Sequence, residues 1–155
     1  MYILDANVVS EMRKTRNGKA DINVVAWAET IPSTSLFVFS ITILEIETGI
    51  LLLKRRDPGQ YAVLREWMDG YVLPTFSKRI LPFDTAVAMC CAKLHIPNPR
   101  PHGDAVIAAT AIVHSMQVVT RNVSDFEPMG VITINPWDFG ISDEFDHAPK
   151  SITSP

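Results

Sequence analysis

The chain has 155 residues, of which 47% are hydrophobic and 20% charged, and its net charge at pH 7 is −3. This length suits one domain with a sizeable core, and the composition is ordinary for a soluble globular protein. The charge excludes a globally basic nucleic-acid binder, so a nucleic-acid ligand would need a local basic patch or a metal ion. No apolar run approaches the roughly 18 residues of a membrane span.

The two cysteines, Cys90 and Cys91, are adjacent within an apolar run. Their spacing suits neither a mutual disulfide nor a zinc site, so we expect reduced core residues. The N-terminus has no basic region followed by an apolar stretch, which argues against a signal peptide. These features predict a cytoplasmic protein without a membrane partner.

The first half of the chain alternates β-branched apolar runs with segments of helical spacing. The polar segment around Gly18 predicts a loop, and the apolar run before Asp5 predicts a short buried strand. The expected elements are a strand at 2–4, a helix at 8–12, a loop at 13–19, a helix at 21–31, a strand at 36–41 and a helix at 42–56.

The second half continues the alternation of helices and strands. A long amphipathic helix is expected, with an interruption or kink near Pro74. Asp84 precedes a helical run and is expected to cap it. The expected elements are helices at 60–77 and 85–94, a helix that begins at 103–104, and strands at 80–83, 117–120 and 131–134.

Short strands of parallel type that alternate with helices predict an α/β sandwich around a parallel sheet. We expect a single domain over residues 1–140. The polar, proline-containing tail at 141–155 is expected to be disordered. In open sheets of this class, ligands bind beyond the carboxyl ends of the strands. Residues that follow the strands are therefore the first candidates for chemistry.

Four acids lie near predicted strand ends or helix starts, and each also has a structural explanation. Helix caps are far commoner than catalytic acids. The four are Asp5, Glu45, Asp104 and Asp125. The structural alternatives are an N-cap at Asp5 or Asn7, a capping box between Thr42 and Glu45, an N-cap at Asp104 and a turn at Ser124-Asp125.

Convergence of the four acids would favour a functional role over these alternatives. Ionised carboxylates that share a pocket repel one another, and burial strengthens the repulsion. Such a cluster is usually tolerated because a cation belongs in it. An all-oxygen donor set suits Mg²⁺ or Mn²⁺ better than zinc. Spacing alone does not establish that the acids converge.

Three stretches resemble the PIN domain of VapC/FitB-type toxins: YILDANVVSEM, SITILEIETGI and GDAVIAATAIVHSMQVVTRNVSDFEPMGVITINPW. They occur in the family's order and extend from Tyr2 to Trp137, while RILPFD resembles the FitB-like branch. The resemblance implies a PIN-like (Rossmann-like) α/β/α sandwich with a central parallel sheet. It also implies metal-dependent cleavage of RNA.

By position, Asp5, Glu45 and Asp104 match the first three acids of the family. The fourth position varies in the family, and this chain offers Asn122 or Asp125. Because Asn122 cannot supply a negative charge, Asp125 is the favoured candidate.

Neighbouring polar residues are expected to support these acids. Asn7 and Thr120 resemble family residues that orient the acids by hydrogen bonding. Once Asp5 is taken as a metal ligand, Asn7 is the better candidate for capping the following helix. Thr42 joins the supporting set through its expected capping box.

The implied chemistry is phosphodiester hydrolysis with Mg²⁺, for which Mn²⁺ is an alternative. Asp5 and Asp104 would bind the ion directly, while Glu45 and Asp125 would bind it, a second ion or its waters. The ion would lower the pKa of a bound water and neutralise the scissile phosphate. Whether one ion or two act is left open by the sequence.

An acidic pocket needs basic groups at its rim to attract a polyanion. The loop expected at 13–19 follows Asp5 closely and carries several such groups, although a solvated loop is an equally good explanation of it. The candidates for RNA contact are Arg13, Lys14, Arg16 and Arg121.

The resemblance implies an endoribonuclease toxin of a type II toxin–antitoxin pair. A VapB-like antitoxin would cover the active site with its C-terminal segment. Its helix would lie in an apolar groove between the helices at 42–56 and 60–77, although packing onto the sheet also explains those apolar residues. Family members also form dimers, so a homodimer is expected. Nothing in the sequence identifies the RNA that is cleaved.

A second hypothesis is a binding role. The chain would then supply oligomerisation to a DNA-bound repressor complex whose antitoxin contacts the DNA, with little nuclease activity of its own. A processing nuclease without an antitoxin is a third possibility. The complete set of acids favours the nuclease hypotheses.

Overall fold

The computed structural model describes residues 1–140, so the tail expected at 141–155 lies outside the described residues. Five strands form one sheet in the order β3-β2-β1-β4-β5, and every neighbouring pair is parallel. The strands are β1 (Tyr2–Leu4), β2 (Leu36–Phe39), β3 (Ile80–Leu81), β4 (Gln117–Val119) and β5 (Thr133–Ile134).

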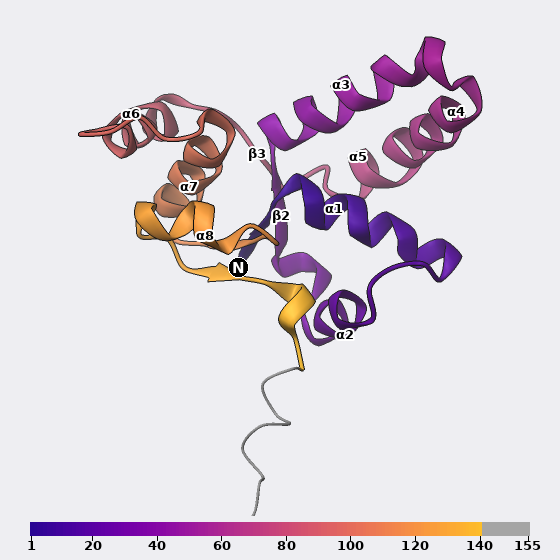
Figure 1. Cartoon of the computed structure of the whole chain (residues 1–155), viewed down its shortest axis with the longest axis horizontal. Coiled ribbons are helices and arrows are strands. Elements are labelled where there is room, and N and C mark those ends of the chain that lie inside the picture. Colours follow the sequence, from indigo (N-terminus) through magenta and orange to yellow (C-terminus); the bar gives the residue numbers. More distant parts are fainter. Residues whose placement is uncertain (141–155) are drawn as a thin grey trace, which may run out of the picture.

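Helices cover both faces of the sheet (Figure 1). One face carries α1 (Ala6–Arg13), α2 (Ile22–Thr30), α3 (Ser40–Arg56) and α4 (Pro58–Trp67), followed by η3 (Met68–Val72) and α5 (Leu73–Thr75). The other face carries α6 (Thr85–Leu94), α7 (His102–His114) and α8 (Val123–Phe126). The predicted α/β/α sandwich with a central parallel sheet is therefore confirmed.

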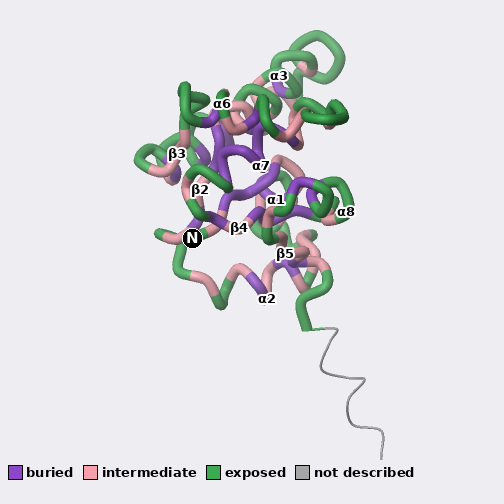
Figure 2. Tube along the Cα trace, turned by 90° about the vertical axis from the view of Figure 1, so that its left-hand side faces the viewer, coloured by how far each residue is buried: buried purple, intermediate pink, exposed green. Residues whose placement is uncertain are grey.

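The core consists of two apolar clusters, one on each face of the sheet. Alternate residues of a strand point to opposite faces. Ile3 accordingly packs into the cluster with α6 and α7, while Leu4 packs into the cluster with α1, α3 and α4. Both side chains are fully buried, and each contributes about 1.5–3 kcal/mol of hydrophobic stabilisation. Figure 2 shows the buried residues concentrated along the sheet and α7.

The helix α7 is almost entirely buried from Ala105 to Ala111. Its alanines allow it to pack closely, and α6 covers much of its remaining surface. Because α7 runs back to the start of β4, its N-terminal end lies at the carboxyl edge of the parallel sheet. This topology brings Asp104, in the first turn of α7, to the edge where β1 and β2 end.

Several predicted boundaries differ from those of the structure. Part of the segment expected as a loop at 13–19 is the 3₁₀ helix η1 (Lys14–Asn17), which ends at Gly18 with φ of 70°. The second strand ends at Phe39 rather than at residue 41, and α3 starts directly after it. The interruption predicted near Pro74 is confirmed, because the long helix departs from α geometry in the π-helical segment η3, which ends at Val72 just before Pro74.

Shorter elements complete the described residues: η2 (Ser33–Ser35), η4 (Glu127–Met129) and η5 (Pro136–Asp138). Asp84 caps α6 as predicted, because its Oδ1 accepts a hydrogen bond of 3.0 Å from the Val87 N–H. Cys90 and Cys91 are both free. Within residues 1–140, every helix is too short or too polar to cross a membrane.

Candidate active site

Asp5 follows β1 directly and is held in place from three directions. Its Oδ1 accepts a hydrogen bond of 2.7 Å from the Ala6 N–H, which makes Asp5 the N-cap of α1. Its Oδ2 accepts hydrogen bonds from Thr120 Oγ1 at 2.8 Å and from Asn7 Nδ2 at 3.1 Å. The carboxylate is therefore fixed in one orientation at the end of the central strand.

These contacts correct one prediction about Asn7. The cap of α1 is Asp5 itself, and the Asn7 side chain orients the Asp5 carboxylate without capping the helix. Asp5 Oδ1 caps the helix, while Oδ2 accepts hydrogen bonds from Asn7 and Thr120. Asp5 can therefore cap α1 and still be a candidate metal ligand. The prediction that Thr120 contacts the first acid agrees with its hydrogen bond to Asp5.

Thr120 lies just beyond β4 and is fully buried. Its hydroxyl donates to Asp5 and accepts a hydrogen bond of 3.0 Å from the Asn122 N–H. Its own N–H donates to the Ile134 carbonyl at 3.0 Å. Thr120 thus ties the ends of β1, β4 and β5 into one rigid edge.

Glu45 lies in the second turn of α3, and the capping box predicted for it is wrong. The helix begins at Ser40 with Phe39 as its N-cap, so Thr42 is already inside the helix. Thr42 Oγ1 is buried and has no hydrogen-bond partner among the described residues. Glu45 is left free to project from the helix.

The Glu45 side chain reaches the first turn of α7. A Cβ atom placed on Gly103 would lie 3.3 Å from Glu45 Oε1, which is closer than most Cβ contacts. Gly103 therefore leaves room for Glu45 beside Asp104. Sequence analysis did not assign Gly103 a role, because the need for a small residue arises only from the approach of α3 to α7.

The electrostatic coupling shows which acids lie near one another. Burial raises the pKa of Glu45, and the charges of Asp5 and Asp104 raise it further. Burial also raises the pKa of Asp104, with further contributions from Asp125 and Asp5. Asp5 thus acts on both Glu45 and Asp104, Asp104 acts on Glu45, and Asp125 acts on Asp104.

Asp125 lies in the first turn of α8 and is exposed. Its N–H donates a hydrogen bond of 3.1 Å to the Asn122 carbonyl, so the predicted turn is also present. Asn122 is exposed as well, and only its backbone bonds to Thr120. Of the two candidates for the fourth position, Asp125 is the one whose charge acts on Asp104.

The chemistry of the donors fits a hard divalent cation. All four are carboxylates, and burial, followed by the charges of neighbouring acids, raises the pKa of Glu45 and of Asp104. Within residues 1–140, no three Asp, Glu, His or Cys side chains are close enough together to hold a metal ion as they lie. Asp5 is fixed by its hydrogen bonds, whereas the side chains of Glu45 and Asp125 are exposed.

The predicted basic residues occupy two places. Arg121 adjoins the acids: its N–H donates to Asn7 Oδ1 at 3.4 Å, and its guanidinium lies 5.2 Å from the centre of the Trp137 ring. The other three residues lie at the far end of α1, which is roughly 12 Å long. They are Arg13 against Trp67, Arg16 against Tyr71, and Lys14 in an ion pair with Glu11.

A groove of about 370 Å³ extends from Glu45 between α1, α3 and α4. The predicted groove between the helices at 42–56 and 60–77 thus exists, with α1 as an additional wall. Apolar side chains from these helices line most of it, while Ser10, Glu45 and Arg13 provide polar groups. Its main apolar lining residues are Ile46, Ile50, Leu53, Leu64 and Trp67.

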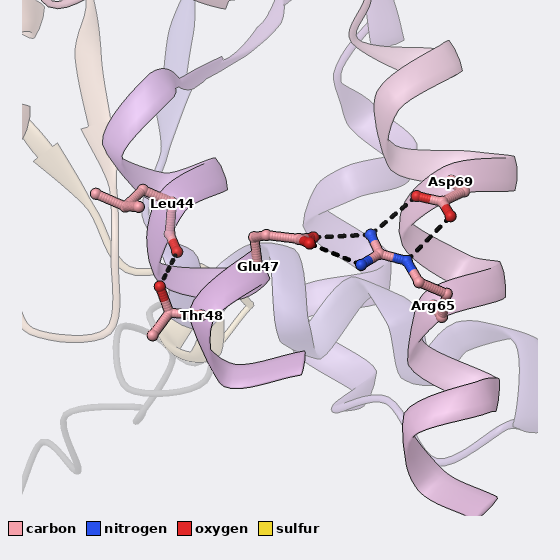
Figure 3. Close-up of polar contacts among 5 residues, drawn as sticks. All are labelled: Leu44, Glu47, Thr48, Arg65 and Asp69. Atoms are coloured by element: carbon pink, nitrogen blue, oxygen red, sulfur yellow. Dashed lines mark hydrogen bonds and ion pairs between the residues drawn. The ribbon is translucent and has the colours of Figure 1, made fainter. Parts of the chain in front are cut away.

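An ion-pair network, which sequence analysis did not detect, joins α3 to α4 (Figure 3). The Arg65 guanidinium donates two hydrogen bonds of 2.7 Å to Glu47 and further hydrogen bonds to Asp69 at 2.9 and 3.0 Å. On α3 itself, Thr48 Oγ1 donates to the Leu44 carbonyl at 2.7 Å. Arg65 therefore fixes the two helices that form the groove.

A five-stranded parallel sheet with helices on both faces and acids near its carboxyl edge defines a Rossmann-like α/β domain. The PIN domain family model matches residues 2–128, so the chain belongs to the PIN-domain family. The resemblance predicted from the sequence is confirmed, and the match includes all four acids.

Relatives similar to nearly the whole chain include the VapC ribonuclease Y4jK of Sinorhizobium fredii, with 34% identity over 147 residues. That alignment covers 89% of this chain and 99% of the relative. Toxin FitB of Neisseria gonorrhoeae is 35% identical over 143 residues, which are 88% of this chain and 99% of FitB. The plasmid stability protein StbB of Pseudomonas syringae is 33% identical and covers 89% of this chain and 99% of StbB.

Solved structures with similar sequences also superpose on most of this chain. A chain in the structure of FitAB bound to an IR36 DNA fragment superposes with a TM-score of 0.78 and 35% identity, covering 88% of this chain and 96% of that one. A chain of FitAcB from Neisseria gonorrhoeae superposes with a TM-score of 0.77 and 34% identity. This alignment covers 88% of the present chain and 99% of the FitAcB chain. The fold described above is therefore that of the PIN domain in these complexes.

Proposed function

We propose that this chain is a metal-dependent endoribonuclease and the toxin of a type II toxin–antitoxin pair. The observation that carries the proposal is the position of Asp5, Glu45, Asp104 and Asp125 near the carboxyl edge of the sheet, where the charges of neighbouring acids add to the effect of burial in raising the pKa values of Glu45 and Asp104. Relatives named VapC ribonuclease and Toxin FitB, aligned over almost their full length, support it. The substrate class is RNA, and the reaction is hydrolysis of a phosphodiester bond.

Mg²⁺ is the proposed cofactor, with Mn²⁺ as an effective substitute. Asp5 and Asp104 would hold the ion, and Glu45 and Asp125 would complete the site after side-chain rotation. When bound, a cation of this kind activates a water for attack and offsets charge on the scissile phosphate.

The protein's own residues prepare the site for this cation. Thr120 and Asn7 hold Asp5 Oδ2 in place through hydrogen bonds of 2.8 and 3.1 Å, so the first ligand needs no reorganisation. Glu45 and Asp104 repel Asp5 and one another until a cation is present. Arg121 stands beside the acids and is the best placed of the four basic residues to contact an RNA phosphate.

The groove between α1, α3 and α4 is the proposed position of a VapB-like antitoxin. Its mostly apolar walls suit the apolar face of a helix or an extended segment. Because Glu45 forms part of the same groove, a segment bound there would cover the candidate active site. The relatives of solved structure support this partner, since FitAB and FitAcB are complexes.

The structure of FitAB bound to DNA also supports a role for the toxin in a DNA-bound complex. In this proposal the antitoxin contacts the DNA, and the present chain contributes a homodimer. Leu51 and Leu52, near the far end of α3, are 52% and 65% exposed and provide apolar surface for self-association. This role is compatible with nuclease activity and would persist without it.

Sequencing of RNA ends after induction of the chain in cells tests the proposal. The wild type should generate new ends at defined sites and arrest growth, and Asp5→Asn should do neither. Asp69→Asn serves as the matched control, because Asp69 is an acid that lies in the Arg65 network. New ends of equal number with Asp5→Asn would show that the active-site assignment is wrong. A wild type that gives neither new ends nor growth arrest would favour the binding role.

A further inference from the structure

A second pocket, of about 360 Å³, shares Glu45 with the α1–α3–α4 groove but is otherwise lined by different residues. It is formed where the start of α3 and the start of α7 meet the segment between β3 and α6. We call it the Phe83 pocket. The residues that define it are Ile41, Leu44, Glu45, Phe83, His102 and Gly103.

The Phe83 pocket offers an exposed aromatic ring next to the candidate active site. Phe83 is 49% exposed, although it lies in a short segment between two ordered elements. Leu44 on the facing helix is 57% exposed. Exposed apolar side chains around a concave surface indicate a site for an apolar ligand or partner.

His102 is a wall of this pocket, and its ring is supported from behind. It stacks on His95, with ring centres 5.7 Å apart and an interplanar angle of 25°. His95 is itself fixed, because its Nδ1 accepts a hydrogen bond of 3.0 Å from the Arg100 N–H. The wall is thus preformed, which lowers the entropic cost of binding a flat ligand.

The charges around the pocket favour a nucleobase over a phosphate group. Within the described part of the chain, no lysine or arginine lines it, and Glu45 contributes a carboxylate. A phosphate would be repelled there, whereas a base has a flat apolar face and no net charge. Base stacking on exposed aromatic side chains is a common way to hold single-stranded RNA.

The Phe83 pocket includes Glu45, one of the four candidate acids, and this limits what can occupy the pocket. Anything in the Phe83 pocket touches Glu45, whose carboxylate lies beside Gly103 and Asp104. A permanent contact with a second copy of the chain at this place would cover a residue that the proposed chemistry needs to be accessible. An RNA base next to the reacting phosphate can contact Glu45 and still leave it accessible to the substrate.

We propose that the Phe83 pocket binds the nucleobase adjoining the scissile phosphate and that Phe83, by stacking on this base, determines cleavage specificity. The inference rests on the proposed ribonuclease function and adds to it a residue that selects the cleavage site. His102 forms the supporting wall of the pocket, and Glu45 marks its boundary with the candidate active site.

The test compares purified wild type with Phe83→Ala, Phe83→Leu and Phe83→Trp. Each protein is given a random-sequence RNA pool with Mg²⁺, and the ends are sequenced. A fluorescent oligonucleotide with the wild-type preferred site is then compared with the same RNA made abasic at one position flanking the cut. Met89→Ala is the control, because Met89 is 63% exposed on α6 and does not line the pocket.

Phe83→Ala and Phe83→Leu should lose base preference at one position beside the cut. Their kcat/KM on the preferred RNA should fall roughly fivefold or more, as expected for one lost stacking contact. The abasic RNA should slow the wild type by a similar factor but leave Phe83→Ala almost unaffected, because both changes remove the same contact. Phe83→Trp should retain the preference, and Met89→Ala should behave as the wild type.

Unchanged preference in Phe83→Ala, with an active wild type, would overturn the inference and leave the ribonuclease function intact. If the same variant instead changed the oligomeric mass in light scattering, the pocket would be a contact between copies of the chain. A wild type that cleaves no RNA would overturn the proposed function, and the inference with it.

Discussion

Two glutamates on α3, Glu45 and Glu47, have opposite electrostatic surroundings. Glu47 accepts two hydrogen bonds of 2.7 Å from Arg65, and this pairing lowers its pKa. Glu45 is near Asp5 and Asp104; burial and then these two charges raise its pKa. Two residues of the same type, separated by one position, are therefore stabilised in opposite protonation states.

The difference separates a structural acid from a functional one. An acid paired with arginine joins helices and is compatible with the folded state alone. A group of acids without compensating cations costs stability, and such groups occur mainly where a ligand or reaction requires them. The Glu47–Arg65–Asp69 network thus serves the scaffold, and the cluster around Glu45 is the candidate for chemistry.

The largest expected effect is the loss of RNA cleavage when an acid of the cluster is neutralised. Asp5→Asn and Asp104→Asn should each lower kcat/KM on the order of 100-fold or more, because a cation that stabilises transition-state charge would lose a ligand. Asp69→Asn, in the paired network, should retain activity close to that of the wild type. Similar losses in all three variants, measured on one RNA, would abolish the distinction between the two regions.

The second prediction concerns the stability of the paired region. Arg65→Ala leaves Glu47 and Asp69 without their common partner and should lower the free energy of unfolding by about 1 kcal/mol. Arg65→Lys should recover part of this, because an ammonium group cannot form the two parallel bonds seen with Glu47. Urea denaturation measures both changes. A fully wild-type stability for Arg65→Ala would mean that the network does not hold α3 to α4.

The third prediction uses Gly103 to move Glu45 without changing its charge. In Gly103→Ala the new methyl group would lie 3.3 Å from Glu45 Oε1, so the carboxylate has to shift. The rate of RNA cleavage should fall roughly threefold to tenfold, because even a small displacement of a catalytic carboxylate lowers the reaction rate. Stability should rise by about 0.5 kcal/mol, since alanine favours the helix. Parallel losses of activity and stability would indicate unfolding rather than displacement of Glu45.

The smallest expected effect is on Tm, measured without divalent cations: neutralising Glu45 and neutralising Glu47 should shift Tm in opposite directions. The raised pKa of Glu45 means that its cost to stability appears as pH rises above the ordinary value of 4.5. The lowered pKa of Glu47 means that its stabilisation is present above 4.5 and is lost as pH falls below it. In EDTA at pH 7, Glu45→Gln should therefore raise Tm and Glu47→Gln should lower it. Shifts of the same sign would contradict the comparison.

Much of the fold follows from local sequence patterns. The apolar run before Asp5 predicted β1, runs rich in β-branched residues predicted β2 and β4, and Asp84 predicted the start of α6 through its cap. The predicted boundaries of helices and strands were wrong where tertiary packing determines them. Because β2 ends at Phe39 and α3 begins at once, Thr42 was assigned to a capping box that does not form.

The candidate site was predictable only in part. The positions of Asp5, Glu45 and Asp104 near strand ends or helix starts, together with the family resemblance, made them candidates. The contacts between elements distant in the sequence could not be predicted, because they depend on how α3 meets α4 and α7. Gly103 against Glu45 is one such contact, and Arg65 with Glu47, 18 residues apart, is another.

Titration with Mn²⁺, followed by electron paramagnetic resonance, tests most directly whether the four carboxylates form one cation site. The signal of free Mn²⁺ should be depleted by wild-type protein and equally by Asp69→Asn, and Mg²⁺ should restore it by competition. Asp5→Asn and Asp104→Asn should leave Mn²⁺ largely free. Binding by Asp5→Asn as tight as that of the wild type, or no binding by the wild type, would contradict the assignment of the cluster as a metal site.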